Sequence, residues 1–184
     1  MDSYNEELKK VLSFANDNKE LVESALGLIA ISIMNTLNEF NVLESKITTM
    51  IANYYMVSYS PELDFKADVL ETGYLSYGQK LKILDMILEK SGFYTNKSVN
   101  SRSLLSPLKT LGDLRNNIIH SVYGLDPERI NDSTPKTIIY ANGRKISKKD
   151  LMVVFSDFEK YHSKSDAQLN EVADFLLEKE RVHE

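Results

Sequence analysis

The chain has 184 residues, of which 42% are hydrophobic and 27% charged, as expected for an ordinary globular protein with one domain and its own core. It contains no cysteine and three histidines without the spacing of a metal motif, which excludes disulfides, thiol nucleophiles and cysteine-based zinc sites. The formal net charge of -5 excludes a broad positive field for nucleic acid, so any contact with nucleic acid has to be local.

The N-terminal segment MDSYNEELKK lacks the basic-then-apolar order of a signal peptide. The most apolar run of the chain, ALGLIAISIM at 25–34, is shorter than the roughly 20 residues that a membrane span needs. We therefore expect a cytoplasmic, soluble protein without a membrane segment. From the composition we also expect neither a metal nor a cofactor.

The first third of the chain is predicted to be helical. Residues 5–57 contain no proline and a single glycine, and their apolar periodicity predicts two or three helices, with breaks near 16–18 and near Asn35 or Asn38. The last of these helices is the clearest, because its apolar residues step by three and four along one face, as in a bundle helix. They are Phe40, Leu43, Ile47, Met50, Tyr54 and Val57.

Two more helices are predicted in the middle of the chain. The first covers 75–90 and ends at Gly92, a residue typical of a helix C-cap, and a loop follows. Pro107 suits the first turn of the next helix, which we expect to continue to Val122 or Tyr123.

A β-hairpin is predicted before the last helix. In TIIYANGRKIS, at 137–147, β-favouring residues flank Asn142 and Gly143, a pair typical of a type I′ turn. The helical period returns from Lys148 and runs to Leu176. The fold is therefore predicted to be mostly α, with a small hairpin inserted before the last helix.

The helix before the hairpin carries polar residues on and beside its apolar stripe. In the stretch LGDLRNNIIHSVYG, a helical wheel sets Arg115 inside the stripe. The edge of that stripe carries four more side chains, those of Asn116, His120, Tyr123 and Asp113. A guanidinium on a buried face is costly unless a carboxylate pairs with it or it faces a cleft.

Two interpretations of this helix follow. In the structural one, Arg115 pairs with a core carboxylate such as Glu44 or Glu71, and His120 is a boundary residue of a packed helix. In the functional one, the stripe packs partly against a second copy of the chain. Arg115, Asn116 and His120 then lie at the rim of a shared cleft that binds an anion.

The residues RNNIIH, from Arg115 to His120, resemble the R-x-x-x-x-H signature of the HEPN superfamily, in which a polar residue such as Asn116 typically follows the arginine. The surrounding L-x-x-L-R-N-x-x-x-H-S pattern, which begins at Leu111, is similar to the third core helix of that family. The motif lies late in an amphipathic helix, after two others and before another, and the resemblance covers about 36–176.

The resemblance implies an up-and-down helical bundle of the HEPN type. The chain would be a single domain over 1–184 with its core at about 36–176, and an N-terminal extension at 1–35 and the hairpin at about 136–147 would be additions to the minimal bundle. Two copies would pair so that their motifs face each other. Many members of the family are metal-independent endoribonucleases of toxin–antitoxin or phage-defence systems, while others are noncatalytic binding modules.

The residues of the motif suit RNA cleavage. RNA supplies its own nucleophile in the 2′-hydroxyl, so the reaction needs a base, an acid and a cation for the developing phosphorane charge. His120 of each protomer would supply base and acid, Arg115 would clamp the phosphate, and Asn116 would orient the phosphate or the imidazole. Asp113 and Tyr123 are candidate accessory residues, although Tyr123 stands one position later than the tyrosine of the H-x-Y variant in some toxins.

A basic cluster around the hairpin has two readings: it tracks an RNA backbone, or it is a solvated surface. Its members are Lys136, Arg144, Lys145, Lys148 and Lys149. We expect RNA as the substrate, a homodimer, and a protein partner such as an antitoxin. The alternatives are a noncatalytic HEPN-like interaction or nucleotide-binding module, and a purely structural bundle that keeps Arg115 in an internal salt bridge.

Overall fold

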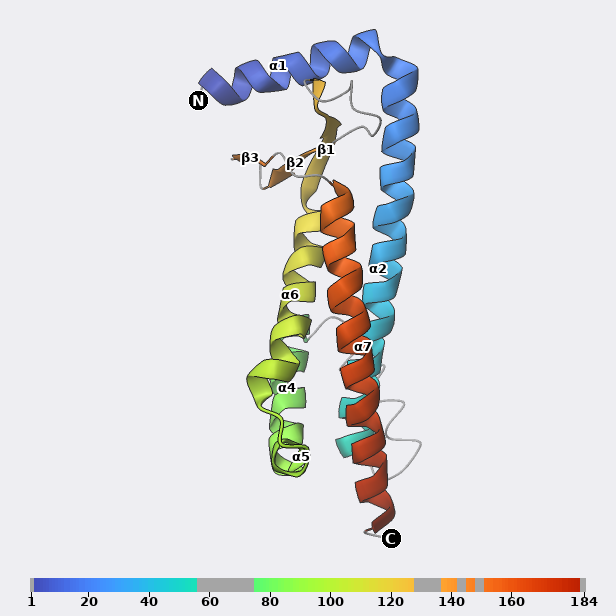
Figure 1. The fold of residues 1–184 in the computed structure, drawn as a ribbon, viewed down its shortest axis with the longest axis vertical. Coiled ribbons are helices and arrows are strands. Elements are labelled where there is room, and N and C mark those ends of the chain that lie inside the picture. The colour runs from blue at the N-terminus through green and yellow to red at the C-terminus, as the bar shows by residue number, and fades with distance from the viewer. Residues whose placement is uncertain (1, 56–74, 128–136, 142–144, 148–150, 183–184) are drawn as a thin grey trace. The chain divides into compact units, whose positions relative to one another are not determined.

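The structure is a computed structural model that describes residues 2–55, 75–127, 137–141, 145–147 and 151–182. Over these residues the chain is mostly α-helical, as predicted, and its long helices are those of a helical bundle (Figure 1).

The chain divides into two compact units. The first unit comprises Met1–Leu37 and Leu114–Glu159, and the second unit comprises Asn38–Asp113 and Lys160–Glu184. The R-x-x-x-x-H motif falls entirely within the first unit, whereas most of the helical core belongs to the second. The expectation of a single domain stays a prediction.

Two helices form the N-terminal part, α1 (Asp2–Asp17) and α2 (Lys19–Tyr55). The first predicted break is confirmed at Asn18, whose side-chain amide donates to a carbonyl in the last turn of α1. The second predicted break, near Asn35 or Asn38, is wrong, because α2 continues through both residues (Figure 1). Both asparagines are exposed, so their side chains meet water without interrupting the backbone ladder.

The length of α2 bears on the expectation that the chain has no membrane segment. Among the described helices, α2 is the one that is long and apolar enough to cross a membrane, with a mean hydropathy of 1.4 over 18 residues. Core helices of soluble proteins and signal sequences meet the same criterion. The property therefore does not by itself place the chain in a membrane.

α4 (Tyr77–Lys90) agrees with the predicted helix. Its N-cap Ser76 and Gln79 form a capping box, in which each residue accepts a hydrogen bond from the backbone N–H of the other. Gly92 has a φ of 74°, in the left-handed region that favours glycine. The loop predicted after it is partly wrong, because the short helix α5 (Phe93–Asn96) comes directly after Gly92.

α6 (Ser101–Ile119) begins and ends earlier than predicted. Pro107 lies in its interior instead of its first turn. The expected continuation of the helix to Val122 or Tyr123 is wrong, because strand β1 (Ser121–Leu125) follows. The sequence SVYGL contains a β-branched and an aromatic residue, and pairing with a neighbouring strand favours the extended backbone for both.

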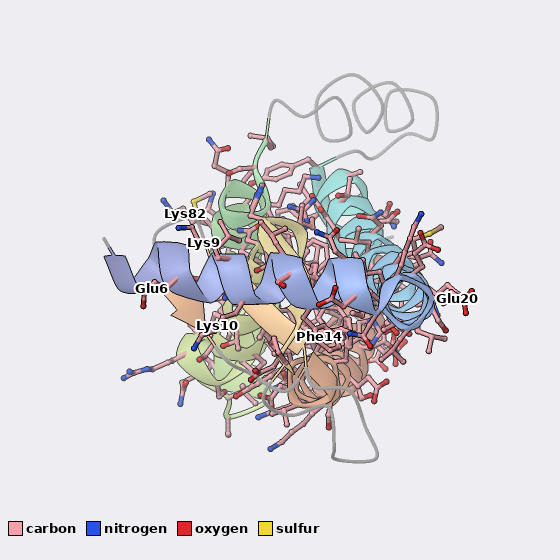
Figure 2. The ribbon with its side chains drawn as sticks, turned by 90° about the horizontal axis from the view of Figure 1, so that it is seen from above. Glu6, Lys9, Lys10, Phe14, Glu20 and Lys82 are labelled. Atoms are coloured by element: carbon pink, nitrogen blue, oxygen red, sulfur yellow. The ribbon has the colours of Figure 1, made fainter. Side chains whose placement is uncertain are left out.

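A three-stranded antiparallel sheet is formed by β1, β2 (Thr137–Ala141) and β3 (Lys145–Ser147), in that order. The antiparallel pairing of β2 with β3 agrees with the predicted hairpin, whose turn at 142–144 lies outside the described residues. The sequence did not predict β1 as a third strand. Helix α1 contacts β1 and lies over the strands when the molecule is seen from above (Figure 2).

The second unit contains a core of helices. The carboxyl-terminal half of α2, α4, α6 and the end of α7 (Leu151–Val182) bury apolar side chains there. The stripe predicted on α2 is confirmed from Phe40 to Met50, while Val57 lies outside the described residues. The most deeply buried members of this core include Phe40, Leu43, Ile47, Leu84, Ile87, Leu88, Leu104, Leu108, Leu169 and Val172.

Two polar contacts stand inside this core. The Nζ of Lys80, a buried residue, donates to Oε1 of Glu44 at 2.7 Å. Tyr77 donates to the carbonyl of Leu108 at 3.0 Å, and its ring packs where Gly112 leaves space, since a Cβ there would meet two ring carbons at 3.0 Å. Burial, and next the negative charge of Glu44, raise the pKa of the Tyr77 phenol well above its ordinary value.

Candidate functional site

The end of α6 holds the first two residues of the motif. Arg115 is half-buried and Asn116 is exposed, and Nη1 of Arg115 donates a hydrogen bond to Oδ1 of Asn116 at 3.0 Å. The neighbouring side chain thus holds Nη1 of the guanidinium, whose Nε is buried. This contact between adjacent residues was missed in the sequence, which suggested the phosphate or the imidazole as the partner of Asn116.

His120 lies just beyond the helix. It is exposed and occupies the turn between α6 and β1, and its backbone N–H donates to the carbonyl of Asn116 at 3.0 Å. The expectation that His120 lies within the helix is therefore wrong by one residue. This position gives the imidazole access to solvent while the backbone bond keeps it one turn above Asn116.

Two side chains of β1 tie the strand to the end of α6. Tyr123 donates its hydroxyl to the carbonyl of Ile118, and Ser121 donates to the carbonyl of Asn117. These carbonyls belong to the last turn of the helix, where no backbone N–H follows to pair with them. The hydroxyl of Tyr123 therefore stabilises the turn that carries His120.

The apolar stripe of α6 was expected to serve a second copy as well as the chain's own core, and the pairing with a second copy stays a prediction. Leu111 and Ile118 are 0% and 1% exposed within the single chain, so the chain's own core already covers them. Of the two carboxylates named in the structural interpretation, Glu44 pairs with Lys80. Glu71, the other carboxylate considered for Arg115, lies outside the described residues.

The register of the sheet relates the basic hairpin to the motif. Ser121, which follows His120, is the partner of Ala141 on β2, and Ala141 is the partner of Lys145 on β3. Neighbouring strands lie about 4.8 Å apart, so Lys145 is two strand spacings from Ser121 in the same row, roughly 10 Å between backbones. The motif and one member of the basic cluster thus lie at the same end of the sheet.

Of the predicted site residues that remain, the structure describes one and leaves four outside the described residues. Asp113 lies on α6 and is exposed. The remaining members of the basic cluster lie outside the described residues; they are Lys136, Arg144, Lys148 and Lys149.

Removing the Tyr123 hydroxyl should destabilise the protein modestly, in a pH-dependent way. Burial raises the pKa of Tyr123 from 10.0 to about 12, so the folded protein holds this proton more tightly than the unfolded chain. The contribution of the Tyr123 hydroxyl to the stability of the fold is present in full below pH 10 and is lost as the pH rises through 12. We expect Tyr123→Phe to lose about 1 kcal/mol at neutral pH.

Thermal midpoints of wild type and Tyr123→Phe, measured side by side from neutral to alkaline pH, check this prediction. The difference between the two proteins should shrink as the pH rises above 10. A difference that is constant across this range would contradict the assignment of the titrating group to Tyr123.

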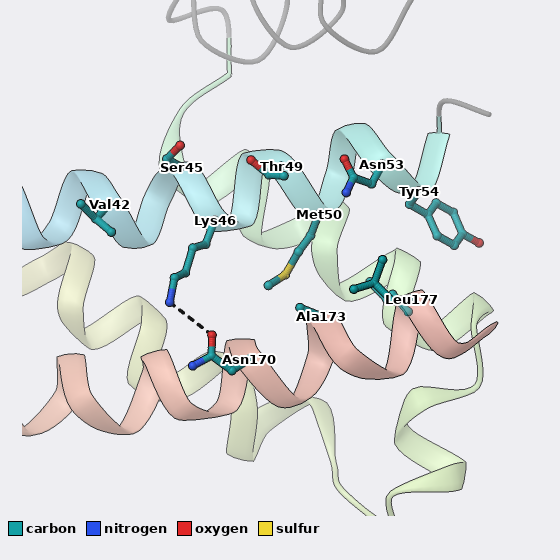
Figure 3. A pocket seen from close by; sticks show the side chains of 11 residues that line it. Val42, Ser45, Lys46, Thr49, Met50, Asn53, Tyr54, Asn170, Ala173 and Leu177 are labelled. Atoms are coloured by element: carbon teal, nitrogen blue, oxygen red, sulfur yellow. Dashed lines mark hydrogen bonds between the residues drawn. The ribbon is translucent and has the colours of Figure 1, made fainter. Parts of the chain in front are cut away.

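The second unit contains a hollow that was not predicted. It has a volume of about 460 Å³ and lies between α2 and α7 (Figure 3). Lys46 stands at one end, where it pairs with Asp166 and donates to Oδ1 of Asn170 at 3.2 Å. Met50 and Leu177 are among the residues that line the apolar part. The ion pair at the polar end is satisfied within the chain, so this hollow offers no open charge for a reaction.

Comparisons of the chain with protein-family models, with curated proteins and with solved structures find no match.

Proposed function

We propose that this chain is a metal-independent endoribonuclease of the HEPN type, with Arg115, Asn116 and His120 in its site. The observation that carries the proposal is the hydrogen bond from Arg115 to Asn116, next to the exposed turn that holds His120. A cation and an imidazole at the accessible end of a helix are the groups that cleavage of an RNA phosphodiester needs.

In the proposed reaction, the imidazole of His120 takes the proton of an RNA 2′-hydroxyl, whose oxygen attacks the adjacent phosphorus. The bond from this phosphorus to the 5′-oxygen of the next nucleotide breaks, and His120 of the partner subunit donates a proton to that oxygen. The products are a 2′,3′-cyclic phosphate and a 5′-hydroxyl. No metal or cofactor takes part.

Arg115 stabilises the charge that develops on the phosphorane oxygens, because its planar guanidinium can donate two parallel hydrogen bonds to a phosphate. Asn116 acts through Arg115: by accepting a hydrogen bond from Nη1 it sets the direction in which the remaining N–H groups point. Asn116 is thus a positioning residue in this proposal.

The strand register supports a path for the RNA backbone, because it sets Ser121 and Lys145 in one row across the three strands. A lysine roughly 10 Å from the turn that carries His120 is at a distance suited to a neighbouring phosphate of the same RNA strand. We assign the other basic residues of the hairpin to the same path; they are Lys136, Arg144, Lys148 and Lys149.

The proposed enzyme acts as a homodimer in the cytoplasm, as a toxin or phage-defence nuclease that a partner protein such as an antitoxin restrains. The alternative is a noncatalytic HEPN-like module, in which the exposed end of α6 binds a nucleotide or a protein without proton transfer. The bond from Arg115 to Asn116 supports either function over a purely structural helix, since it directs Nη1 of the half-buried guanidinium toward an exposed side chain.

Incubation of the purified protein with single-stranded RNA in EDTA tests this proposal. We expect cleavage that persists in EDTA and leaves a cyclic phosphate, detectable by mass spectrometry of the fragments. An RNA with a 2′-deoxy sugar at the cleavage position should resist, because it lacks the nucleophile. Binding of the oligonucleotide without any cleavage would favour the noncatalytic alternative.

A further inference from the structure

The hollow between α2 and α7 has the size of a small-molecule site. Its volume of about 460 Å³ falls within the roughly 300–1,000 Å³ that is typical of such sites. Its lining runs from Lys46 and Asn170, past Met50, to Tyr54 and Leu177 (Figure 3). Along α2 the distance from Lys46 to Tyr54 is roughly 12 Å at the rise of an α-helix.

The end of the hollow away from Lys46 is apolar. Met50 and Leu176 are buried there, whereas Leu177 keeps 47% of its surface exposed. A methionine side chain is flexible and polarisable, so it can follow the shape of an apolar ligand. A ligand that covers Leu177 removes apolar area from water, which favours binding.

The polar end offers a hydrogen-bond donor without a net charge. Lys46 pairs with Asp166 and donates to Oδ1 of Asn170 at 3.2 Å. An ammonium group has three N–H donors, and in the described part of the chain these contacts engage two of them, so one is left for an acceptor. A charged head group would be attracted by one member of the ion pair and repelled by the other, and it would lose hydration. This end therefore suits an uncharged acceptor, such as a hydroxyl or an ester carbonyl.

The extent of the apolar walls favours a small molecule over a helix of another protein. A helix that docks in a groove places apolar anchors along several turns of both walls. On α2 the residue one turn before Val42 is Asn38, and on α7 the residues before Asn170 are Asp166 and Ser163. Asn38 and Ser163 are exposed and polar, so the apolar walls end there and leave a docked helix few anchors.

We propose that this hollow binds an uncharged single-chain amphiphile. Its apolar chain lies along Met50 and Leu177, and its head group accepts a hydrogen bond from Nζ of Lys46. An extended chain advances about 1.2 Å per bond, so about ten carbon atoms match the length between Lys46 and Tyr54. The proposal does not rest on RNA cleavage, because the lining residues belong to the second unit and the R-x-x-x-x-H motif to the first.

Calorimetric titration of the full chain with 1-decanol tests this proposal, and decanoate and decyltrimethylammonium serve as charged probes with the same alkyl chain. We expect 1-decanol to bind about tenfold more tightly than either charged probe, because only the charged head groups lose strong hydration. Tighter binding of a charged probe, or no binding of any of the three, would overturn the proposal.

Variants of the lining locate the bound molecule. Ala173→Phe places a ring in the hollow and should abolish binding of 1-decanol, while the matched control Ala167→Phe, at an exposed position of α7, should bind it like wild type. Leu177→Glu changes an exposed lining residue, so the fold should persist while binding weakens. Binding that neither Ala173→Phe nor Leu177→Glu reduces would place 1-decanol elsewhere and contradict the proposal.

The donor at the polar end has its own test. Lys46→Met should weaken binding of 1-decanol about tenfold, because one hydrogen bond to a charged donor is lost. Lys164→Met, which removes an exposed lysine of α7, should leave the affinity unchanged. Equal affinities of the two variants would contradict the assigned position of the head group. A dimer of wild type that Leu177→Glu converts to a monomer, together with no binding of 1-decanol, would replace the amphiphile with a second copy of the chain.

Discussion

Replacing His120 by alanine is expected to lower the rate of RNA cleavage by about a hundredfold or more, because the variant loses the group that moves protons in the transition state. Arg115→Ala should show a loss of similar size, since a preorganised cation on the developing phosphate charge contributes about as much. Single-turnover cleavage of a labelled RNA, measured with enzyme in excess, checks both values.

The chain offers matched controls for both substitutions. Arg102 is an exposed arginine at the start of α6, and His162 lies on α7, so Arg102→Ala and His162→Ala remove the same groups elsewhere in the chain. Both controls should cleave at the wild-type rate. Equal activity of His120→Ala and His162→Ala would assign the cleavage to a contaminant or to another site.

The stability of Arg115→Ala separates the active-site interpretation from the structural one. The active-site interpretation expects Arg115→Ala to keep a thermal midpoint within a few degrees of wild type, because the bond from Arg115 to Asn116 is exposed to solvent and contributes little. An arginine that neutralised a buried carboxylate would instead cost roughly 3–5 kcal/mol on removal. A large drop in the midpoint of Arg115→Ala would therefore support the structural interpretation.

Removing the carboxylate of Glu44 is expected to have the largest effect on stability. The side chain of Lys80 is 7% exposed and that of Glu44 is 24% exposed, so Glu44→Ala leaves an ammonium group in the core without its partner. The expected loss is roughly 3–5 kcal/mol in the free energy of unfolding, measured by urea denaturation. The double variant Glu44→Leu with Lys80→Met removes both charges and should recover most of this loss.

A second ion pair of the same unit provides the control for this effect. The side chains of Lys46 and Asp166 are 36% and 34% exposed, so water can solvate either one when the other is removed. Asp166→Ala should therefore cost about 1 kcal/mol or less. Equal losses for Glu44→Ala and Asp166→Ala would contradict the view that burial of Lys80 sets the size of the effect.

The helical fold was largely readable from the sequence, because apolar spacing is a local property of the chain. The stripe from Phe40 to Met50 predicts the buried face of α2, and the residues on either side of Asn142 and Gly143 predict two paired strands. The spacing of Arg115 and His120 is likewise visible without a structure, so the candidate site residues could be named in advance. The chemistry assigned to them remains a proposal.

Where elements begin and end depended on contacts between distant segments. The sequence around His120 continues the helical period, but pairing of β1 with β2 ends the helix at Ile119, because the ladder bonds of a sheet favour the extended backbone over another helical turn. The position of Lys145 in the row of Ser121 follows from strand register, which the hairpin alone does not define.

Tertiary structure also decides which surface covers each apolar helix face. Periodicity marks the stripes of α2 and α6 as apolar, but it does not say which surface covers them. The chain's own core covers Leu111 and Ile118, which were expected to serve a second copy as well as the core, while Leu28 and Ile31 remain exposed on α2. The hydrophobic effect acts on any apolar area without direction, so only the packing of distant segments determines which face is buried within the chain and which is left for a partner.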